Sequence, residues 1–503
     1  MSRNGTTFEF TAGDGRGGGA DVLLVPLAAK PQPALQLVSA ADAVCADAVS
    51  ALLAAKAVGE EVGYLAHTTS TGTYRRIVVV GLGEAEKVTS QIIRRAAAGT
   101  ARWLVSEHIG SAALWMDGLA ATGVEDATSH WAGGMALAGF QFAEYRQTDE
   151  KAVAKVRVQV RCSESGHVRR ELPAIRRESL VAEATNYARR LAHLPGNVIN
   201  PTTLAAEARL LARHARLKCT VIDAAQAKRL GMGGLLAVGG GSATPPCLIQ
   251  LEYRGLPRTR RRTVIVGKAI TFDTGGYSIK PAAGLEAMKF DKCGGTTVLG
   301  IMKAVATLKL PCNVMGLIAA AENAVSQRAY RPGDILKMMS GKTVEVISTD
   351  AEGRLVLADA LTYAQQKLKP TEMIDLATLT GGVSVALGKQ AAGLMSNDDE
   401  LAGELGECGR RVGERLWRLP LWSEYRDLIK GTDSDIKNSG GKRDAHAIAG
   451  GMFLKEFVDD GVAWAHLDIA GVATSEDNNT PTGKGATGFG VRLLVDYLSR
   501  GRG

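Results

Sequence analysis

The sequence runs Thr263-Val-Ile-Val-Gly-Lys268-Ala-Ile-Thr-Phe-Asp273-Thr-Gly-Gly-Tyr-Ser-Ile-Lys280, an apolar run followed by a glycine-containing loop. The β-branched residues before Lys268 predict a buried strand that ends at this lysine. A lysine amine at the end of an apolar strand is costly unless it has a role. Because ligands bind beyond the carboxyl ends of strands in open α/β sheets, this stretch predicts a functional edge.

The same order of strand, loop and helix recurs from about residue 180 onward. Strands are predicted at 313–320, 343–347 and 373–379, and helices at 295–308 and 355–366. This alternation predicts a larger α/β domain in which helices flank a mixed central sheet. Lys268, Asp350 and Thr380 each follow a predicted strand, so we expect them to meet at one edge of that sheet.

Residues 1–165 are predicted to form a smaller, macro-like α/β domain. Apolar runs at 22–26 and 77–81 predict buried strands, and alanine-rich stretches at 40–57 and 90–105 predict helices. Gly81-Leu-Gly83 follows one of these strands. We interpret it as a turn, because Glu86 stands where a dinucleotide-binding loop has its third glycine. The charge-rich residues 166–182 are predicted to be a linker, and residues 183–503 to form the larger domain.

The composition bounds the class of protein. A length of 503 residues predicts at least two domains. The net charge of +8 permits contact with nucleic acid without arguing for it, and we interpret the arginine clusters as solvated or interdomain surface. Seven scattered cysteines without a Cys-x-x-Cys pair indicate a reducing compartment. Without a signal-peptide core or an apolar run of membrane-spanning length, a cytoplasmic protein is expected.

Four acids lie in the predicted loops of this sheet edge: Asp273, Asp291, Asp350 and Glu352. Each alone would be interpreted as a surface acid, but together such carboxylates can hold two divalent cations. Asp350 and Glu352 are two residues apart, so in an extended segment both side chains would lie on one face. Gly353 would permit a tight turn into the next helix. The set predicts a two-metal hydrolase.

Three cationic side chains accompany the acids. Lys268 can bind a metal if a neighbouring cation removes its proton. Lys280 is suited to stabilise an oxyanion, and Arg354 to hold a planar anion in a bidentate fork. The eight histidines lie outside these motifs, so no nucleophile–histidine triad is indicated. We interpret one of them, His466, as a structural hydrogen-bonding residue.

These motifs resemble those of the leucyl (cytosol) aminopeptidases. Residues 348–355, Ser-Thr-Asp-Ala-Glu-Gly-Arg-Leu, are similar to the family signature Asn-Thr-Asp-Ala-Glu-Gly-Arg-Leu, and residues 266–280 are similar to the family's first metal loop. Further matches lie at 197–202, 232–239, 329–334, 375–381 and 464–471. The resemblance extends from about residue 180 to about residue 495.

The resemblance implies a metal-dependent aminopeptidase that assembles as a homohexamer. It would release N-terminal L-amino acids from peptides, preferring leucine and other apolar residues. Two divalent ions per subunit are implied (zinc or manganese, with magnesium or cobalt as further candidates), together with bicarbonate as a catalytic anion. By matching position, Lys268, Asp273, Asp291 and Glu352 would bind the tighter metal. Asp273, Asp350 and Glu352 would bind the exchangeable one.

The remaining site residues follow from the same resemblance. Lys280 would polarise the scissile carbonyl. Arg354 would hold the bicarbonate, which acts as general base toward the metal-bridging water, and the resulting hydroxide would attack the carbonyl. The backbone of Leu379 would contact the substrate. The pocket for the first side chain would be lined by Met288, Thr378 and Gly381.

Three residues depart from the family pattern: Ser348 replaces a usual Asn, Ala269 a usual Gly and Lys292 a usual Met. Ser348 would loosen the loop that presents Asp350. Lys292 adds a positive charge beside Asp291 unless its side chain points away. We expect altered metal affinity or rate rather than loss of activity.

Three other functions remain open at this point. The first is the same fold with an added non-enzymatic role in DNA binding or structure, although no DNA-binding motif is visible. The second is an inactive homologue, against which the intact metal and anion residues argue. The third is a two-metal phosphoesterase, which usually recruits histidine ligands and would not explain Lys268.

Overall fold

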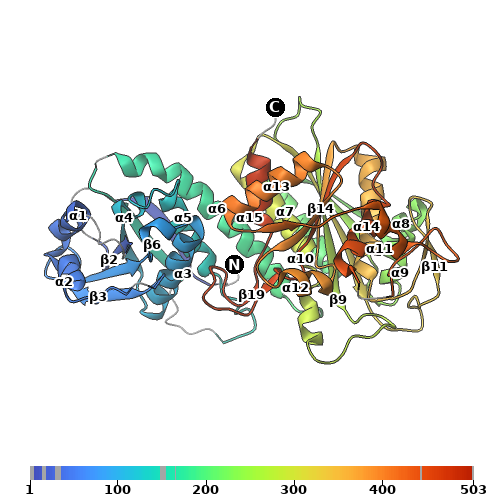
Figure 1. Ribbon diagram of the computed structural model, residues 1–503, viewed down its shortest axis with the longest axis horizontal. Helices are drawn as coiled ribbons and strands as arrows, with labels where there is room; N and C mark the ends of the chain where they lie inside the picture. The colour runs from blue at the N-terminus through green and yellow to red at the C-terminus, as the bar shows by residue number, and fades with distance from the viewer. Residues whose placement is uncertain are drawn as a thin grey trace. The chain divides into compact units, whose positions relative to one another are not determined.

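The computed structural model describes residues 5–13, 19–28, 35–59, 61–147, 154–164, 166–441 and 444–500. The chain divides into two compact units, Met1–Glu183 with Glu476–Lys484 and Ala184–Ser475 with Gly485–Gly503. Each unit contains a mixed sheet with helices (Figure 1), which confirms the predicted α/β architecture with a smaller N-terminal domain and a larger second domain. Among the described helices, none is long and apolar enough to cross a membrane.

The predicted linker at 166–182 is instead part of one helix, α6 (His167–His193). Its charged residues are exposed or partly exposed, whereas Ile175, Val181 and Ala182 are buried, so the charge-rich sequence lies on the outer side of a helix. The division between the two units falls inside this helix, between Glu183 and Ala184. The N-terminal unit also includes residues 476–484, which are distant in sequence.

The N-terminal unit has a six-stranded sheet in the order β1-β6-β5-β2-β4-β3, parallel except at the edge strand β3. Along β2, Leu23 and Val25 pack with α1 and α2, whereas Val22 and Leu24 pack with α3 and α5 on the other face. The predicted strands and helices of this region are present. The bounds are β1 Thr7–Ala12, β2 Val22–Leu27, α1 Leu35–Cys45, α2 Ala48–Ala54, β3 Leu65–Thr69, β4 Arg76–Gly81, η1 Ala85–Lys87, α3 Ser90–Ser106, β5 Ser111–Trp115, α4 Asp117–Ala120, α5 Ala127–Ala138 and β6 Lys155–Arg161.

The second unit has an eight-stranded sheet in the order β15-β14-β17-β13-β9-β10-β8-β7. The central strands β17, β13, β9 and β10 are parallel, and antiparallel pairs flank them on both sides. The bounds through β10 are α7 Pro201–Ala215, β7 Lys218–Ile222, α8 Ala224–Leu230, α9 Gly233–Gly239, β8 Cys247–Arg254, β9 Thr263–Asp273, η2 Leu285–Phe290, α10 Cys293–Leu308 and β10 Asn313–Asn323.

The rest of this unit completes the sheet and adds a small three-stranded sheet, β11-β12-β16. The bounds are β11 Ile335–Lys337, β12 Thr343–Glu345, α11 Glu352–Tyr363, η3 Ala364–Leu368, β13 Glu372–Ala377, α12 Gly381–Leu387, β14 Ala392–Ser396, α13 Asp399–Val412, β15 Leu416–Arg418, η4 Ser423–Ile429, β16 Ile436–Lys437, α14 His446–Lys455, β17 Ala463–Asp468, β18 Thr474–Ser475, β19 Gly485–Ala486 and α15 Val491–Ser499. The loop that carries Asp350 therefore follows β12 of the small sheet and not a strand of the central sheet.

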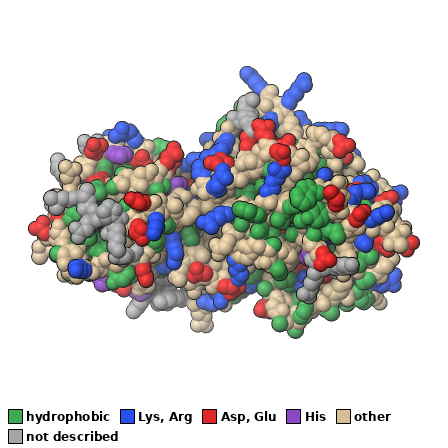
Figure 2. Space-filling view, in the orientation of Figure 1, with side chains coloured by type: hydrophobic (Ala, Val, Ile, Leu, Met, Phe, Trp, Pro, Cys, Tyr) green, Lys and Arg blue, Asp and Glu red, His purple; other side chains and the backbone are tan. Residues whose placement is uncertain are grey.

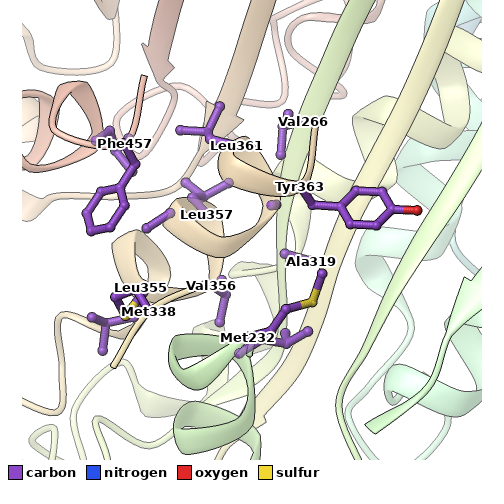
Figure 3. Packing of buried hydrophobic residues seen from close by; sticks show 14 of the residues in the cluster. Met232, Val266, Ala319, Met338, Leu355, Val356, Leu357, Leu361, Tyr363 and Phe457 are labelled. Carbon is purple, nitrogen blue, oxygen red and sulfur yellow. The ribbon is translucent and has the colours of Figure 1, made fainter. Parts of the chain in front are cut away.

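A core cluster lies between the central sheet and helices α9, α11 and α14. Figure 3 shows Leu357 and Leu361 of α11 among these buried side chains, with Val266 of β9 and Phe457 nearby. Burying aliphatic side chains of this size contributes about 1.5–3 kcal/mol each. This packing fixes α11 against β9, and both elements carry residues of the candidate site.

Candidate active site

Strand β9 continues past the point where the sequence predicts its end. Its pairing with β13 stops at Gly267, whereas its pairing with β10 continues to Asp273. Lys268 therefore lies inside the strand, opposite Ala319 of β10, and its other side is no longer covered by β13. The divergence of β13 leaves space at the carboxyl edge of the sheet, where the functional side chains gather.

Three of the four predicted acids are buried. Asp273, Asp291 and Glu352 are buried, and Asp350 is exposed. Ligand atoms of Asp273, Asp350 and Glu352 all lie within 4.8 Å of one another. Glu352 is the first residue of α11, so the expectation of one extended segment for Asp350 and Glu352 is wrong. A turn into the helix brings them together.

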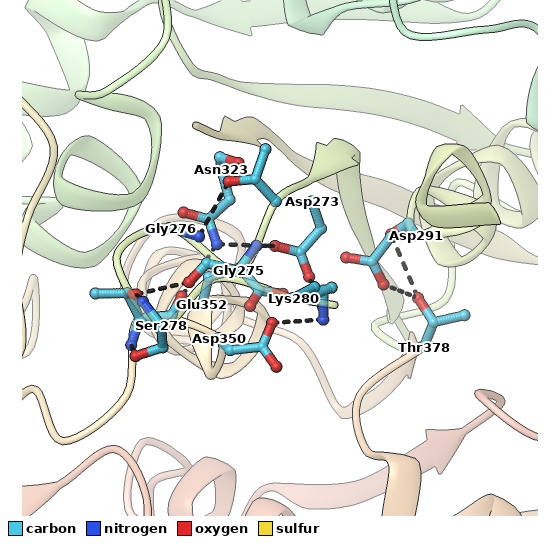
Figure 4. A network of polar contacts seen from close by, with 12 residues as sticks. Asp273, Gly275, Gly276, Ser278, Lys280, Asp291, Asn323, Asp350, Glu352 and Thr378 are labelled. Atoms are coloured by element: carbon cyan, nitrogen blue, oxygen red, sulfur yellow. Dashed lines mark hydrogen bonds and ion pairs between the residues drawn. The ribbon is translucent and has the colours of Figure 1, made fainter. Parts of the chain in front are cut away.

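Two lysines hold the four acids as two ion-paired groups. The Lys268 Nζ lies 2.9 Å from Asp291 Oδ2 and 2.8 Å from Glu352 Oε1, and it donates a hydrogen bond to the carbonyl oxygen of Thr378 at 2.8 Å. The Lys280 Nζ lies 2.9 Å from Asp273 Oδ2 and also pairs with Asp350. Figure 4 shows Asp273, Lys280 and Asp350 side by side, with Asp291 held by Thr378.

Residues outside the predicted set hold the loops in place. Asn323, at the end of β10, donates hydrogen bonds to Asp273 Oδ1 at 2.8 Å and to the Thr349 carbonyl at 3.0 Å. The Thr349 hydroxyl donates to the carbonyl of Gly275 at 2.6 Å and accepts from the amide of Ser278 at 2.7 Å. These bonds join the loop after β9 to the loop before α11, and they position Asp273 and Asp350 relative to each other (Figure 4).

Gly353 is required for a reason that the local sequence does not reveal. It lies within the first turn of α11, so it does not serve as a flexible turn. A Cβ atom at this position would be 2.7 Å from Lys268 Cε and 2.8 Å from Lys268 Nζ. A side chain at this position would force the Lys268 side chain to shift away from its ion pairs, so Gly353 allows the helix to approach the lysine closely.

Burial and charge shift the pKa values of this group. Burial raises the pKa of Glu352, Asp291 and Asp350 above the ordinary carboxyl range, and the lysines reduce this rise. Burial lowers the pKa of Lys268 and Lys280, but the surrounding carboxylates outweigh it and raise both values overall. The acids therefore depend on nearby cations to remain ionised at neutral pH.

Arg354 is buried beside this cluster. Its Nη1 donates a hydrogen bond to the carbonyl oxygen of Asn438 at 2.7 Å, and its guanidinium lies 6.0 Å from the Phe453 ring centroid. Among the described residues, none hydrogen-bonds its buried Nε. Burial lowers the pKa of Arg354 to about 10, so it remains charged at neutral pH. The free N–H edge suits a planar anion.

A cavity of about 330 Å³ joins all of these groups. It is lined by every predicted site residue: Lys268, Asp273, Lys280, Met288, Asp291, Asp350, Glu352, Arg354, Thr378, Leu379 and Gly381. Asp468, at the end of β17, accepts hydrogen bonds from the Leu379 amide at 3.1 Å and the Thr380 hydroxyl at 2.6 Å. The cavity walls thus come from the ends of β9, β13 and β17, from the segments that follow these strands, and from the N-terminal turns of α11 and α14.

Thr380 also lines the cavity, as its place after a predicted strand led us to expect. Further lining residues were not among the predicted site residues: Ala287, Phe290, Ser384, His446, Ala470, Ala473 and Thr474. Those after β17 could have been expected, because this strand is parallel to β13 and ends at the same edge. His446 had no such signal, because it begins helix α14 and follows no central strand.

The structure also locates two departures from the family pattern. The Ser348 hydroxyl accepts a hydrogen bond from the Asp350 amide at 3.2 Å, so the serine supports the loop by a local turn. The Lys292 side chain is fully buried and points away from the acids, donating from Nζ to the carbonyl of Leu194 at 2.9 Å and to the carbonyl of Lys289. Burial lowers the pKa of Lys292 to about 7.

Replacing Lys292 with methionine is expected to stabilise the protein. At pH 7 the free energy lost by burying the Lys292 amine exceeds the stabilisation from its two hydrogen bonds. Lys292→Met should therefore raise the free energy of unfolding by about 1–3 kcal/mol. The folded-state pKa lies below that of the unfolded chain. The gain should therefore shrink as the pH approaches about 10, where the unfolded lysine also loses its proton. Urea denaturation at two pH values measures this, with exposed Lys337→Met as control. A destabilised Lys292→Met variant would contradict it.

The residues of the cavity fit divalent metal ions. Carboxylate oxygens are the ligands that hard divalent cations prefer. The Glu352 Oε2 atom is buried and, within the described part of the chain, accepts no hydrogen bond, which is costly unless a cation satisfies it. Its neighbours in the three-acid group, Asp273 and Asp350, present oxygens to the same point. The carboxylates present are therefore suitable ligands for divalent ions. Lys268 could bind an ion only after its amine had lost its proton.

Comparisons with known proteins show which family the chain resembles. Residues 186–495 match the catalytic domain of the cytosol aminopeptidase family, and residues 24–149 match its N-terminal domain. A probable cytosol aminopeptidase of Aquifex aeolicus is 44% identical, over 84% of each chain. One of Geobacter sulfurreducens is 42% identical, over 92% of this chain and 93% of the relative. The solved bottromycin maturation enzyme BotP in complex with Mn has a TM-score of 0.84 and 31% identity, covering 96% of this chain and 99% of the other.

Proposed function

The chain belongs to the cytosol aminopeptidase family of metal-dependent peptidases, and we propose that it releases N-terminal L-amino acids, leucine and other apolar residues first, from peptides. The observation that carries this proposal is the single cavity lined by four acids, two lysines and an arginine. Its volume of about 330 Å³ suits one amino-acid side chain and the adjoining peptide bond.

The bound metals would supply Lewis acidity, lowering the pKa of a shared water and polarising the scissile carbonyl. Lys268, Asp273, Asp291 and Glu352 would hold one ion, and Asp273, Asp350 and Glu352 the other. Zinc or manganese is proposed, with magnesium or cobalt as alternatives. The manganese named for the bottromycin enzyme supports such an ion here.

The chain's own residues would then orient and stabilise the reacting groups. Lys280 lines the cavity and retains its charge, so it would donate to the carbonyl oxygen as negative charge develops. The free edge of Arg354 would hold bicarbonate as a proton-accepting anion. Asp468 fixes the loop of Leu379 and Thr380, so the Leu379 backbone would align the substrate.

The apolar part of the cavity supports the proposed preference for apolar first residues. Met288, Phe290, Leu379 and Ala473 contribute to its lining, and Thr378 and Gly381 complete the proposed pocket. An apolar side chain placed there would leave the solvent, which favours binding by about 25 cal/mol per Å² buried. A charged first side chain would lose its hydration without a partner in this part of the cavity.

A cytoplasmic homohexamer remains part of the proposal, supported by the family resemblance. An added DNA-binding role has less support. The arginine cluster at 258–262 partly stabilises the fold, because Arg261 pairs with Glu372 at 3.1 Å. On the face drawn in Figure 2, lysine and arginine side chains are interspersed with acidic ones and form no continuous basic surface. Recognition of DNA usually uses a basic patch or stripe.

An amidase assay tests the proposed function. The purified protein should hydrolyse leucine p-nitroanilide in the presence of Mn²⁺ or Zn²⁺, lose this activity in a chelator, and regain it when the metal is restored. An N-acetylated leucine substrate is the matched control and should not be cleaved, because the free amine would bind at the metals. Inactivity on leucine substrates at saturating metal would contradict the proposal, and activity that survives chelation would contradict its metal chemistry.

A further inference from the structure

His446 is the only histidine among the residues that line the cavity in the described part of the chain. It is the first residue of α14, preceded by Ala445 in a left-handed conformation with φ 46°. The side chain is half-buried. None of the site chemistry proposed above uses it.

The packing of α14 places this histidine beside α12 in the wall of the cavity. A Cβ atom on Gly382, in the first turn of α12, would be 2.9 Å from His446 Cβ and 3.3 Å from Nδ1. One helical turn later, a Cβ atom on Gly450 would be 3.4 Å from Arg354 Nη2 and 3.1 Å from Leu379 Cδ2. Residues four apart share a helix face, so the face that carries His446 approaches both the arginine and the substrate-aligning loop.

The imidazole lies in an environment that keeps it neutral. Burial lowers the pKa of His446 below its usual 6.5, and the charge of Arg354 lowers it further, while Asp468 and Asp350 oppose this. The other charged residues on elements packed against α14 are the exposed Glu424, Arg426 and Asp427 of η4, and Glu352 and Asp359 of α11. Across the described residues, no hydrogen bond occupies either ring nitrogen of His446. At pH 7 one of them carries an available lone pair.

We propose that His446 is a further catalytic residue, a general base that lines the same cavity as the acids and Arg354 and takes the water proton when Arg354 holds no bicarbonate. This inference rests on the proposed aminopeptidase function. One O–H bond of the attacking water breaks, and its proton moves to the free imidazole nitrogen while the oxygen bonds to the carbonyl carbon. When the C–N bond breaks, the imidazolium returns this proton to the leaving amine. Proton transfer of this kind contributes about 10²–10⁴-fold in rate.

A rescue experiment tests this role in the manganese-loaded full-length protein, in buffer freed of carbonate. His446→Gly should lower kcat on leucine p-nitroanilide by about 100-fold with little change in KM, and added imidazole should restore much of it. His446→Gln, which keeps the size but cannot accept the proton, should stay low. The matched control is His214→Gln, an exposed histidine on α7, which should behave as wild type. Metal content and the thermal midpoint should be unchanged in both glutamine variants.

Chemical modification provides a second readout that does not depend on turnover. Diethyl pyrocarbonate should modify His446 in the free protein, as detected by peptide mass spectrometry, and free leucine should protect it. Provided that the wild type is active, any of three results would overturn the role of His446 and leave the aminopeptidase function standing. These are an unchanged kcat in His446→Gly, no rescue by imidazole, and equal dependence of wild type and variant on added bicarbonate. A wild type without aminopeptidase activity would contradict both the proposed function and the role of His446.

Discussion

Asp273→Asn is expected to reduce kcat/KM on leucine substrates by about 1,000-fold or more, equivalent to ~4 kcal/mol of transition-state stabilisation. Asp273 is one of the two acids proposed to bind both metals, and it is buried at the end of β9. Asparagine can still accept from the Gly275 amide, which now donates to Asp273 Oδ1 at 2.9 Å, so the loop should keep its conformation. Its amide nitrogen, however, cannot bind a cation or pair with Lys280.

Metal analysis and kinetics together check this prediction. The variant should retain at most one of the two metals per subunit, and its thermal midpoint without metal should remain close to that of the wild type. Asp334→Asn removes one carboxylate in the same way, but from a partly exposed pair with Arg331 outside the cavity, and should be nearly neutral. Full activity and metal content in Asp273→Asn would exclude this residue as a shared ligand.

Asp375→Ala is expected to destabilise the protein by about 3–5 kcal/mol. Asp375 lies on β13 opposite His466 of β17, and both side chains are fully buried. Its carboxylate contacts the His466 Nδ1 at 2.5 Å and accepts a hydrogen bond from the Trp464 indole at 2.8 Å. Alanine would leave both groups buried and unpaired. This arrangement agrees with the interpretation of His466 as a structural residue.

Denaturant titration measures this loss, and its pH dependence identifies the cause. Burial lowers the pKa of His466, but Asp375 raises it more, so the folded value lies above the unfolded value of about 6.5. The pair therefore contributes most below that pH, and the contribution falls as the pH rises through the folded pKa. The difference between wild type and Asp375→Ala should be larger at pH 6 than at pH 9. The control, Asp375→Asn, retains an acceptor for the indole and should cost less. Equal stability of all three proteins would exclude the buried pair as a determinant of the fold.

Much of the site could be predicted from the sequence because its residues lie in short, locally recognisable segments. β-branched runs predict the central strands, glycine-punctuated loops predict their ends, and carboxylates in those loops predict a cation site. The predicted residues do line one cavity. The helical conformation of 166–182 was not predicted, because high charge indicates a solvated surface whether that surface is a loop or the outer face of a helix.

The sequence by itself determined the elements, the chemical groups and the family resemblance, because hydrophobic periodicity and motif spacing are local properties. Only the tertiary structure decided which distant groups meet. Gly353 is necessary because Lys268 lies against it, Asn323 because it joins Asp273 to Thr349, and His446 enters the cavity because α14 packs on Gly382. These contacts join residues tens of positions apart through strand register and helix packing. Which residues meet at the site therefore depends on how far β9 extends past β13. No local sequence pattern specifies this extension.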